Sequence, residues 1–155
     1  MADINELLES AKLGDRRSLS MLISAISESD DFQSPNSRPG WTLGVTGPPG
    51  SGKSTLIGQM VRKWASSGER VAVLALDPTS PLSGGSFLAD RIRMEGDDIR
   101  ENVFVRSIPS GKNPGAISPI LWPICSVLSE CGWTRIIVET VGTGQSEFRI
   151  AALVD

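Results

Sequence analysis

The sequence reads Gly47-Pro48-Pro49-Gly50-Ser51-Gly52-Lys53-Ser54 between an apolar run, Trp41 to Val45, and a helical pattern, Thr55 to Ala65. This stretch fits the phosphate-binding pattern G-x-x-x-x-G-K-[S/T]. A glycine-rich turn between a strand and a helix can point successive backbone N–H groups into one hollow, and the helix adds the positive end of its dipole. The stretch therefore predicts a site for a nucleoside triphosphate. A chance glycine-rich loop is the alternative, which the setting between strand and helix disfavours.

The side chains of this loop have separate expected tasks. Lys53 is expected to reach the outer phosphates, and the Ser54 hydroxyl to complete the ligand shell of a Mg²⁺ ion. The glycines allow the turns because they place no Cβ in the way. The nucleotide-binding residues predicted are Gly47, Gly50, Ser51, Gly52, Lys53, Ser54 and Thr55.

Composition narrows the chemistry that the chain can perform. With 155 residues there is room for about one domain. Lys and Arg number 15 against 18 Asp and Glu, so the net charge of -3 does not indicate a nucleic-acid partner. The absence of histidine excludes imidazole metal sites and histidine acid–base catalysis. Carboxylates, cations, backbone dipoles and a hard metal ion remain.

The compartment expected is the cytoplasm, without contact to a membrane. No apolar stretch approaches the roughly 18 residues needed to span a bilayer. Asp3, Glu6 and Glu9 precede any basic cluster, which argues against a secretory or organelle signal. Cys125 and Cys131 are expected to be buried or inert thiols in a reducing environment.

Two regions of different character divide the chain. Amphipathic patterns over Asp3 to Leu13 and Arg16 to Glu28 predict a pair of helices, and a connector rich in Ser, Asp, Pro and Asn follows from Ser29 to Gly40. We therefore treat residues 1–40 as a helical extension and linker that packs and takes no part in catalysis. Residues 41–155 form the predicted nucleotide-binding domain.

From Trp41 onward, apolar runs alternate with helical patterns, which is typical of a parallel sheet flanked by helices. The helix after the phosphate loop is expected to end at Ser66-Ser67-Gly68. A further helix is expected around Ile124 to Cys131, because Pro119 and Pro123 limit how early it can start. The predicted strands are Thr42–Thr46, Val71–Leu76, Asn102–Arg106 and Arg135–Val138. The fold class predicted is a three-layer α/β fold of the P-loop NTPase type with a mainly parallel sheet.

Acidic residues end two of the apolar runs. Ligands of open α/β sheets lie beyond the carboxyl ends of the strands, so Asp77 and Glu139 are candidates to hold Mg²⁺ or its coordinating water. A solvated charge at a strand end is the alternative, and it weighs more for Asp77 than for Glu139. Three residues after Glu139, the Gly142 amide is placed to donate to a γ-phosphate. The catalytic residues predicted are Lys53, Glu139 and Gly142.

A polar segment from Phe87 to Met94 carries Asp90, Arg91 and Arg93. It could close over the nucleotide, or it could form a salt-bridged surface turn. Both interpretations stay open from the residues alone.

Five motifs in order carry a resemblance to a known family: Gly47–Ser54, Asp77–Ser80, Ser83–Ser86, Asp90–Met94 and Val138–Glu147. The sequence resembles the MeaB/ArgK family, the methylmalonyl-CoA mutase-associated GTPases that are also labelled transport-system kinases for lysine, arginine and ornithine. The resemblance runs from about the first helices to the last residue.

The resemblance implies a P-loop GTPase that acts as a metallochaperone for a cobalamin-dependent acyl-CoA mutase of the methylmalonyl-CoA mutase type. It implies GTP as substrate, Mg²⁺ as cofactor and the mutase as partner. By position, the metal site would consist of Ser54, Asp77, Asp90 and Glu139. The family label leaves a second function open, that of a kinase or ATPase phosphorylating a periplasmic amino-acid-binding protein.

The sequence departs from the family pattern at two places. Residues 113–118, followed by Pro119 and Pro123, differ from the family's glycine-rich entry into a basic helix. The sequence also stops at Asp155, before the N-K-x-D segment that reads guanine and before the arm through which the family forms homodimers. We therefore expect a fold incomplete at its C-terminus, with GTP preference implied by the resemblance alone. A truncated fragment that binds nucleotide without turnover is the third reading.

Overall fold

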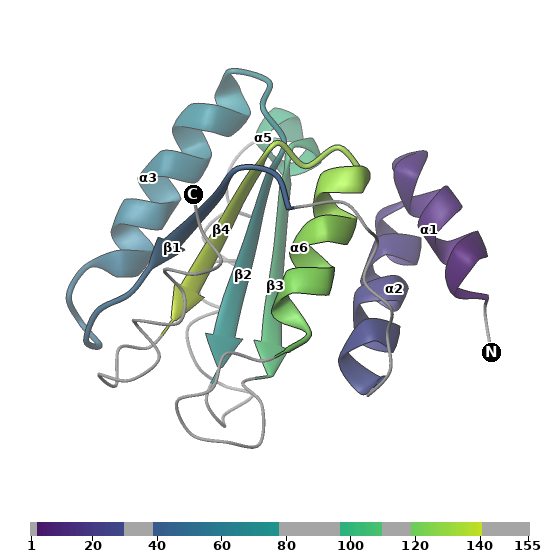
Figure 1. Cartoon of the computed structure of the whole chain (residues 1–155). Helices are drawn as coiled ribbons and strands as arrows, with labels where there is room; N and C mark the ends of the chain where they lie inside the picture. The colour runs from purple at the N-terminus through teal and green to yellow at the C-terminus, as the bar shows by residue number, and fades with distance from the viewer. Residues whose placement is uncertain (1–2, 30–38, 78–96, 110–118, 141–155) are drawn as a thin grey trace.

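The computed structural model describes residues 3–29, 39–77, 97–109 and 119–140. Its centre is a four-stranded sheet in the order β1-β4-β2-β3, and every pairing is parallel. Figure 1 shows the strands running side by side between helices, so the prediction of a layered α/β fold with a parallel sheet is confirmed. The strands are β1 (Thr42–Val45), β2 (Val71–Asp77), β3 (Val103–Pro109) and β4 (Arg135–Thr140).

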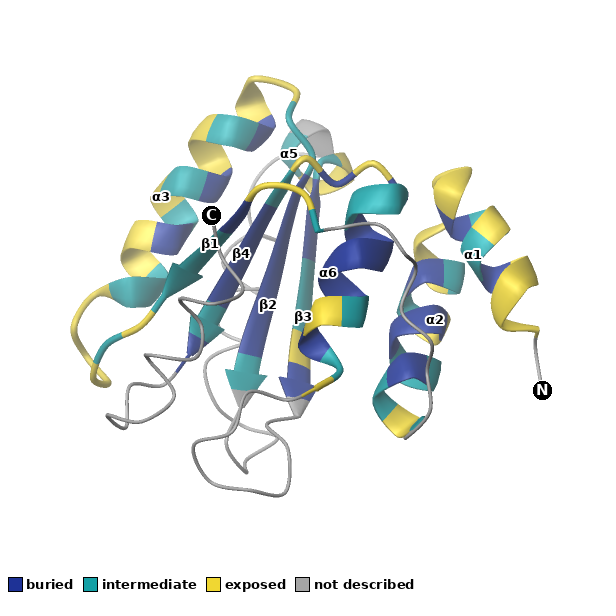
Figure 2. Ribbon diagram, in the orientation of Figure 1, coloured by how far each residue is buried: buried dark blue, intermediate teal, exposed yellow. Residues whose placement is uncertain are grey.

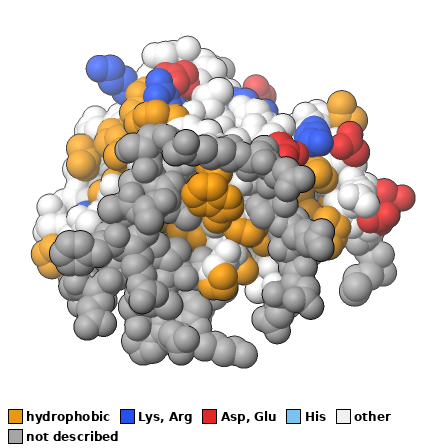
Figure 3. Space-filling model, viewed as in Figure 1, with side chains coloured by type: hydrophobic (Ala, Val, Ile, Leu, Met, Phe, Trp, Pro, Cys, Tyr) orange, Lys and Arg blue, Asp and Glu red, His pale blue; other side chains and the backbone are white. Residues whose placement is uncertain are grey.

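Helices cover both faces of this sheet. On one face α3 packs with Ile99 of the short helix α5 beside it, and on the other α2 and α6 pack side by side with α1 outside α2 (Figure 1). The helices are α1 (Ile4–Lys12), α2 (Arg16–Glu28), α3 (Lys53–Ser66), α5 (Asp97–Glu101) and α6 (Leu121–Glu130). Figure 3 shows the charged side chains of the described residues mainly along the edge where the strands begin and around the N-terminal helices.

Two aspartates start the N-terminal helices. The Asp3 carboxylate accepts a hydrogen bond from the Asn5 N–H, and Asp15 accepts from the N–H groups of Arg17 and Ser18. These are N-caps, which satisfy amides that have no partner inside the helix. The predicted helix pair is confirmed with nearly the expected bounds.

The core lies on both faces of the sheet and is larger on the α2–α6 side (Figure 2). On that side α2 contributes Leu19, Leu22, Ile23 and Ile26, all of them buried against the same cluster as the sheet and α6. On the α3 side a smaller cluster joins Ile57, Val61 and Ala65 of the helix to Val71, Val73, Val103 and Ile137 of the sheet. Helix α3 therefore rests on fewer buried side chains than the helices opposite.

The expected start of α6 is wrong by one turn. The helix begins at Leu121, and its first internal hydrogen bond runs from the Ile124 N–H to the Ile120 carbonyl at 3.1 Å. Pro123 thus lies in the first turn, where backbone N–H groups have no helical partner and proline removes nothing.

Strand β3 and helix α5 also differ from the sequence predictions. Strand β3 continues past the expected end at Arg106 to Pro109, paired with β2 along its whole length. The Arg106 guanidinium, half-buried on the α2 face, donates to the Ser24 hydroxyl at 2.6 Å, so a charged residue is accommodated inside this strand. Helix α5, which no sequence pattern indicated, precedes β3 and carries a single apolar side chain, Ile99.

Candidate functional site

The phosphate-loop residues join β1 to α3. Gly52 is the N-cap of α3 with φ 88°, in the left-handed region that a side chain rarely adopts. At Gly47 an added Cβ would lie 3.2 Å from the Ser51 hydroxyl oxygen, so the loop closes tightly on itself there. Gly50 also has a positive φ of 75°. The predicted glycines therefore occupy positions that require them.

Backbone amides at the start of α3 are available to an anion. The first hydrogen bond inside the helix runs from the Leu56 N–H to the Gly52 carbonyl. The N–H groups of Lys53, Ser54 and Thr55 precede it, and Gly52 offers no side chain to cap them. Because α3 extends over 14 residues, its dipole adds positive potential at this end.

Lys53 folds back across the loop. Its Nζ donates to the Gly47 carbonyl at 2.7 Å and to the Pro48 carbonyl at 2.9 Å. An ammonium group has three N–H donors, so a third can address a phosphate oxygen while the loop carbonyls hold the other two. These contacts place the positive charge at the loop.

Ser54 and Glu139 meet although they are far apart in the sequence. The Ser54 hydroxyl donates to the Glu139 carboxylate at 3.2 Å. Glu139 is on β4, opposite Val45 of β1 in the parallel register, so the strand that leads into the loop is next to the strand that carries the acid. Side chains alternate along β4, and Glu139 points to the α3 face like the core residue Ile137.

These two side chains fit a magnesium ion. Both offer hard oxygen atoms, which Mg²⁺ prefers at about 2.1 Å in octahedral geometry. Adjacent ligands of such an octahedron are about 3 Å apart, close to the 3.2 Å between the Ser54 and Glu139 oxygens. Within the described part of the chain Glu139 forms no ion pair with a cationic side chain, and no group of three His, Cys, Asp or Glu is present.

Other predicted site residues lie at or beyond the limits of the description. Asp77 is the last residue of β2, with its backbone opposite Pro109, and its side chain is outside the described residues. Asp90 and Gly142 fall in 78–96 and 141–155, which are also outside. The structure therefore brings Lys53, Ser54 and Glu139 together with the loop glycines and leaves the other three untested.

Sequence reasoning overlooked one polar group beside the site. Thr140 follows Glu139 on β4 and is buried, and its hydroxyl has no hydrogen-bond partner among the described residues. Its side chain alternates with Glu139 and so faces the α2–α6 side of the sheet. The one sequence feature that could have pointed to Thr140 was its position directly after Glu139, the predicted acid. Separately, no helix within the described ranges is both long and apolar enough to cross a bilayer.

Comparisons with known proteins agree on a family. The family model described as methylmalonyl Co-A mutase-associated GTPase MeaB matches residues 15–155. A Pyrococcus horikoshii protein provisionally named as a GTPase is 38% identical over 163 residues, which cover 100% of this chain and 51% of that protein. GTPase ArgK of Escherichia coli is 42% identical over 113 residues, covering 73% of this chain and 34% of ArgK.

A mammalian protein and one solved structure are also similar. The mitochondrial methylmalonic aciduria type A homolog of Mus musculus is 39% identical over 113 residues, covering 73% of this chain and 27% of that protein. The crystal structure of FtsY from Mycoplasma mycoides superposes with a TM-score of 0.48 at 16% identity, covering 96% of this chain and 50% of FtsY. The chain spans about half the length of the first two curated relatives, 51% and 49%.

Proposed function

Because the chain belongs to the MeaB family of methylmalonyl-CoA mutase-associated GTPases, we propose that it binds GTP together with Mg²⁺ and hydrolyses the GTP. The observation that carries this proposal is the hydrogen bond between Ser54 and Glu139 beside the loop held by Lys53. It joins a phosphate-binding helix to a strand-end carboxylate, the combination that a triphosphate and its metal require.

In the proposed mechanism each group has one task. The amides at the start of α3 and the third N–H of Lys53 bind the outer phosphates, while Ser54 and Glu139 hold the metal ion. When bound, Mg²⁺ neutralises the charge that develops on the phosphate oxygens. Asp77 and Asp90 stay proposed as further acids of the metal site, the segments near Asp90 and Gly142 as switches, and the Gly142 amide as a hydrogen-bond donor to the γ-phosphate. Positioning and electrostatic stabilisation supply the rate enhancement.

Release of inorganic phosphate from GTP tests the proposal. The chain should release phosphate only with Mg²⁺, and Lys53→Ala should lower both GTP affinity and turnover because the loop loses its positive charge. Lys63→Ala is the matched control, since Lys63 is an exposed lysine on the same helix. Equal phosphate release by wild type and Lys53→Ala would contradict the proposal.

We further propose that the GTP cycle assists a cobalamin-dependent acyl-CoA mutase. The family description, which names methylmalonyl-CoA mutase, supports this partner. A purified mutase of that type should change the rate of GTP hydrolysis, and GTP should change the binding of the two proteins. If the mutase does not change the rate of GTP hydrolysis and GTP does not change the binding of the two proteins, the partner proposal is wrong. The proposal that the chain hydrolyses GTP would not be affected by that result.

The proposed compartment is the cytoplasm. Both cysteines, Cys125 and Cys131, are buried free thiols, as expected for a protein of a reducing environment. Fractionation of cells that produce the protein tests this placement.

A further inference from the structure

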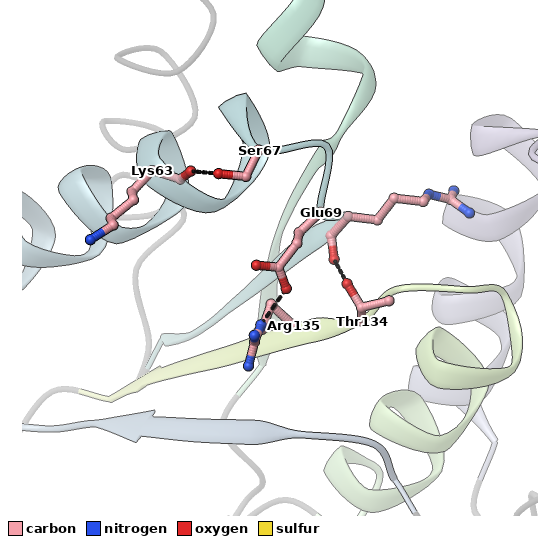
Figure 4. Close-up of polar contacts among 6 residues, drawn as sticks. Lys63, Ser67, Glu69, Thr134 and Arg135 are labelled. Atoms are coloured by element: carbon pink, nitrogen blue, oxygen red, sulfur yellow. Dashed lines mark hydrogen bonds and ion pairs between the residues drawn. The ribbon is translucent and has the colours of Figure 1, made fainter.

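A cluster of aromatic and charged side chains lies at the end of the sheet where the strands begin. The phosphate loop lies at the opposite end, where β1 ends. Arg135, the first residue of β4, donates from its Nε to the Glu69 carboxylate at 2.6 Å (Figure 4). Its guanidinium carbon is 4.7 Å from the ring centre of Trp41 and 5.4 Å from that of Trp64. The two rings meet edge to face, 5.4 Å apart. We call these four residues the Arg135 cluster.

The Arg135 cluster ties together the elements that carry the nucleotide site. Trp41 directly precedes β1, Trp64 is in the last turns of α3, and Glu69 follows α3. The Glu69 N–H donates to the Trp64 carbonyl at 3.0 Å, which holds Glu69 beside the helix end. The arginine of β4 thus contacts both the strand before the phosphate loop and the helix after it.

The spacing along α3 and β4 connects this cluster with the metal side of the site. Arg135, Ile137 and Glu139 alternate along β4 and face α3. From the first to the last of them the strand rises about 13 Å. Helix α3 rises about 15 Å from Ser54 to Trp64. The two elements therefore meet at both ends through polar side chains, with an apolar contact between.

Of the two end contacts between α3 and β4, only the one between Ser54 and Glu139 would change when a metal ion binds. The Ser54 hydroxyl would have to turn its proton away from Glu139 for both oxygens to hold a metal ion, whereas the Arg135 contacts involve no atom of the nucleotide site. The apolar cluster between α3 and the sheet is the smaller of the two cores, so it leaves the helix more freedom to shift. The distant end has to keep the helix in register while the near end exchanges its contact.

We propose that Arg135 is a positioning residue for the metal side of the nucleotide site. By holding the end of α3 against the start of β4, it sets the separation between the Ser54 hydroxyl and the Glu139 carboxylate. The inference rests on the proposed function, because that separation matters only if a metal ion and a triphosphate bind there. Arg135 touches neither ligand and acts through α3 and β4.

Arg70 provides a matched control at the same edge. Its guanidinium carbon is 4.3 Å from the ring centre of Trp133, and its Nη1 donates to the Cys131 carbonyl at 2.8 Å. Trp133 belongs to the core on the α2–α6 face, so Arg70 makes the same kind of contact on the side without α3. Loss of Arg135 removes two cation–π contacts and a charged hydrogen bond, whereas loss of Arg70 removes one cation–π contact and a hydrogen bond to a backbone carbonyl.

The test measures GTP affinity of the full chain by calorimetry, with Mg²⁺ and with the metal chelated. Arg135→Met should reduce the gain in affinity that Mg²⁺ provides by about 2- to 30-fold, the range for a residue that acts on a site without touching its ligands. Affinity without Mg²⁺ should stay near that of wild type, and Arg135→Lys should recover part of the gain. Arg70→Met should leave the gain unchanged. Equal effects of Arg135→Met and Arg70→Met would overturn the inference.

A double-variant cycle separates positioning from simple loss of stability. In a Ser54→Ala background the hydroxyl is gone, so Arg135→Met should add no further loss of the Mg²⁺ gain, and full additivity would overturn the inference. If the methionine variant does not fold, Arg135→Lys and Arg70→Lys give the same comparison. Absence of any Mg²⁺-dependent GTP binding by wild type would instead refute the proposed function together with this inference.

Discussion

Glu139 is a half-buried carboxylate whose described partner is a neutral hydroxyl, so its negative charge is available to a cation. We predict that Glu139→Gln, which keeps the shape and removes the charge, raises the Mg²⁺ concentration needed for half-maximal GTP hydrolysis by at least about 10-fold. Glu101→Gln, an exposed glutamate of α5, is the control. An unchanged Mg²⁺ requirement in Glu139→Gln would remove this residue from the metal site.

The two cysteines differ from ordinary thiols because they are buried. Desolvation raises the pKa of Cys125 to about 12 and that of Cys131 to about 11. A thiol with a raised pKa in the folded state stays protonated while the unfolded thiol, with a pKa near 9, has already ionised. The thiol contribution to stability is therefore complete below about pH 9 and is lost as pH rises toward 11 and 12.

We predict that the free energy of unfolding falls across this alkaline window and falls less in the Cys125→Ala, Cys131→Ala double variant. Urea denaturation at a series of pH values measures the difference. At pH 8 iodoacetamide should label neither thiol in the folded protein and both in urea, since thiolates are the reactive form. Rapid labelling without urea would show that burial does not protect them.

Among helices and strands, α6 offers the sharpest test of local structure. Pro123 lies before the first helical hydrogen bond, so Pro123→Ala should change the free energy of unfolding by less than about 1 kcal/mol. Ile124→Pro would delete the N–H that bonds to Ile120 and should cost about 3 kcal/mol or more. Urea unfolding monitored by circular dichroism measures both. Ile124→Ala removes the same buried side chain but keeps the N–H, so an equal loss in Ile124→Pro and Ile124→Ala would mean that α6 starts later than Leu121.

Periodicity predicted most elements because it reports which side chains must be buried. The apolar runs of β2 and β4 and the stripe of α3 are visible in sequence for that reason. Helix α5 was missed because five residues with one apolar side chain have no period, and β3 was predicted too short because Arg106 interrupts its pattern. Strand order lies beyond such reasoning, since the pairing of β1 with β4 joins distant segments.

Part of the candidate site could be predicted from the sequence because its residues either form one continuous motif or end a predicted strand. The phosphate loop is one continuous motif, so Gly47, Lys53 and Ser54 were predicted directly as binding residues. Glu139 was found because the carboxyl ends of parallel strands share an edge. Its contact with Ser54 depends on β1 and β4 being neighbours, and the Arg135 cluster depends on the same pairing, so neither was predicted.

For the protein as a unit, α2 forms part of the main core. Leu22, Ile23 and Ile26 are fully buried, and Arg16 of the same helix donates to the Arg100 and Val103 carbonyls next to β3. We predict that Ile23→Ala costs about 2 to 5 kcal/mol, as a core position of the sheet would. Leu13→Ala, at a residue 91% exposed, should cost less than about 0.5 kcal/mol.

Chemical denaturation followed separately by tryptophan fluorescence and by circular dichroism measures these costs. Coincident curves are expected, because α2 and the sheet share one buried cluster and should unfold together. Two separated transitions would indicate that the N-terminal helices unfold on their own.

The strand order has a consequence for biosynthesis. In the described sheet β1 hydrogen-bonds only to β4, which is the last of the four described strands to leave the ribosome, while β2 and β3 can pair earlier. The nascent polypeptide therefore pairs β1 late, and until then the phosphate loop proposed to bind GTP lacks the support of the sheet. Stalled chains ending before Arg135 should gain no protease resistance from GTP, whereas chains extended beyond Thr140 should.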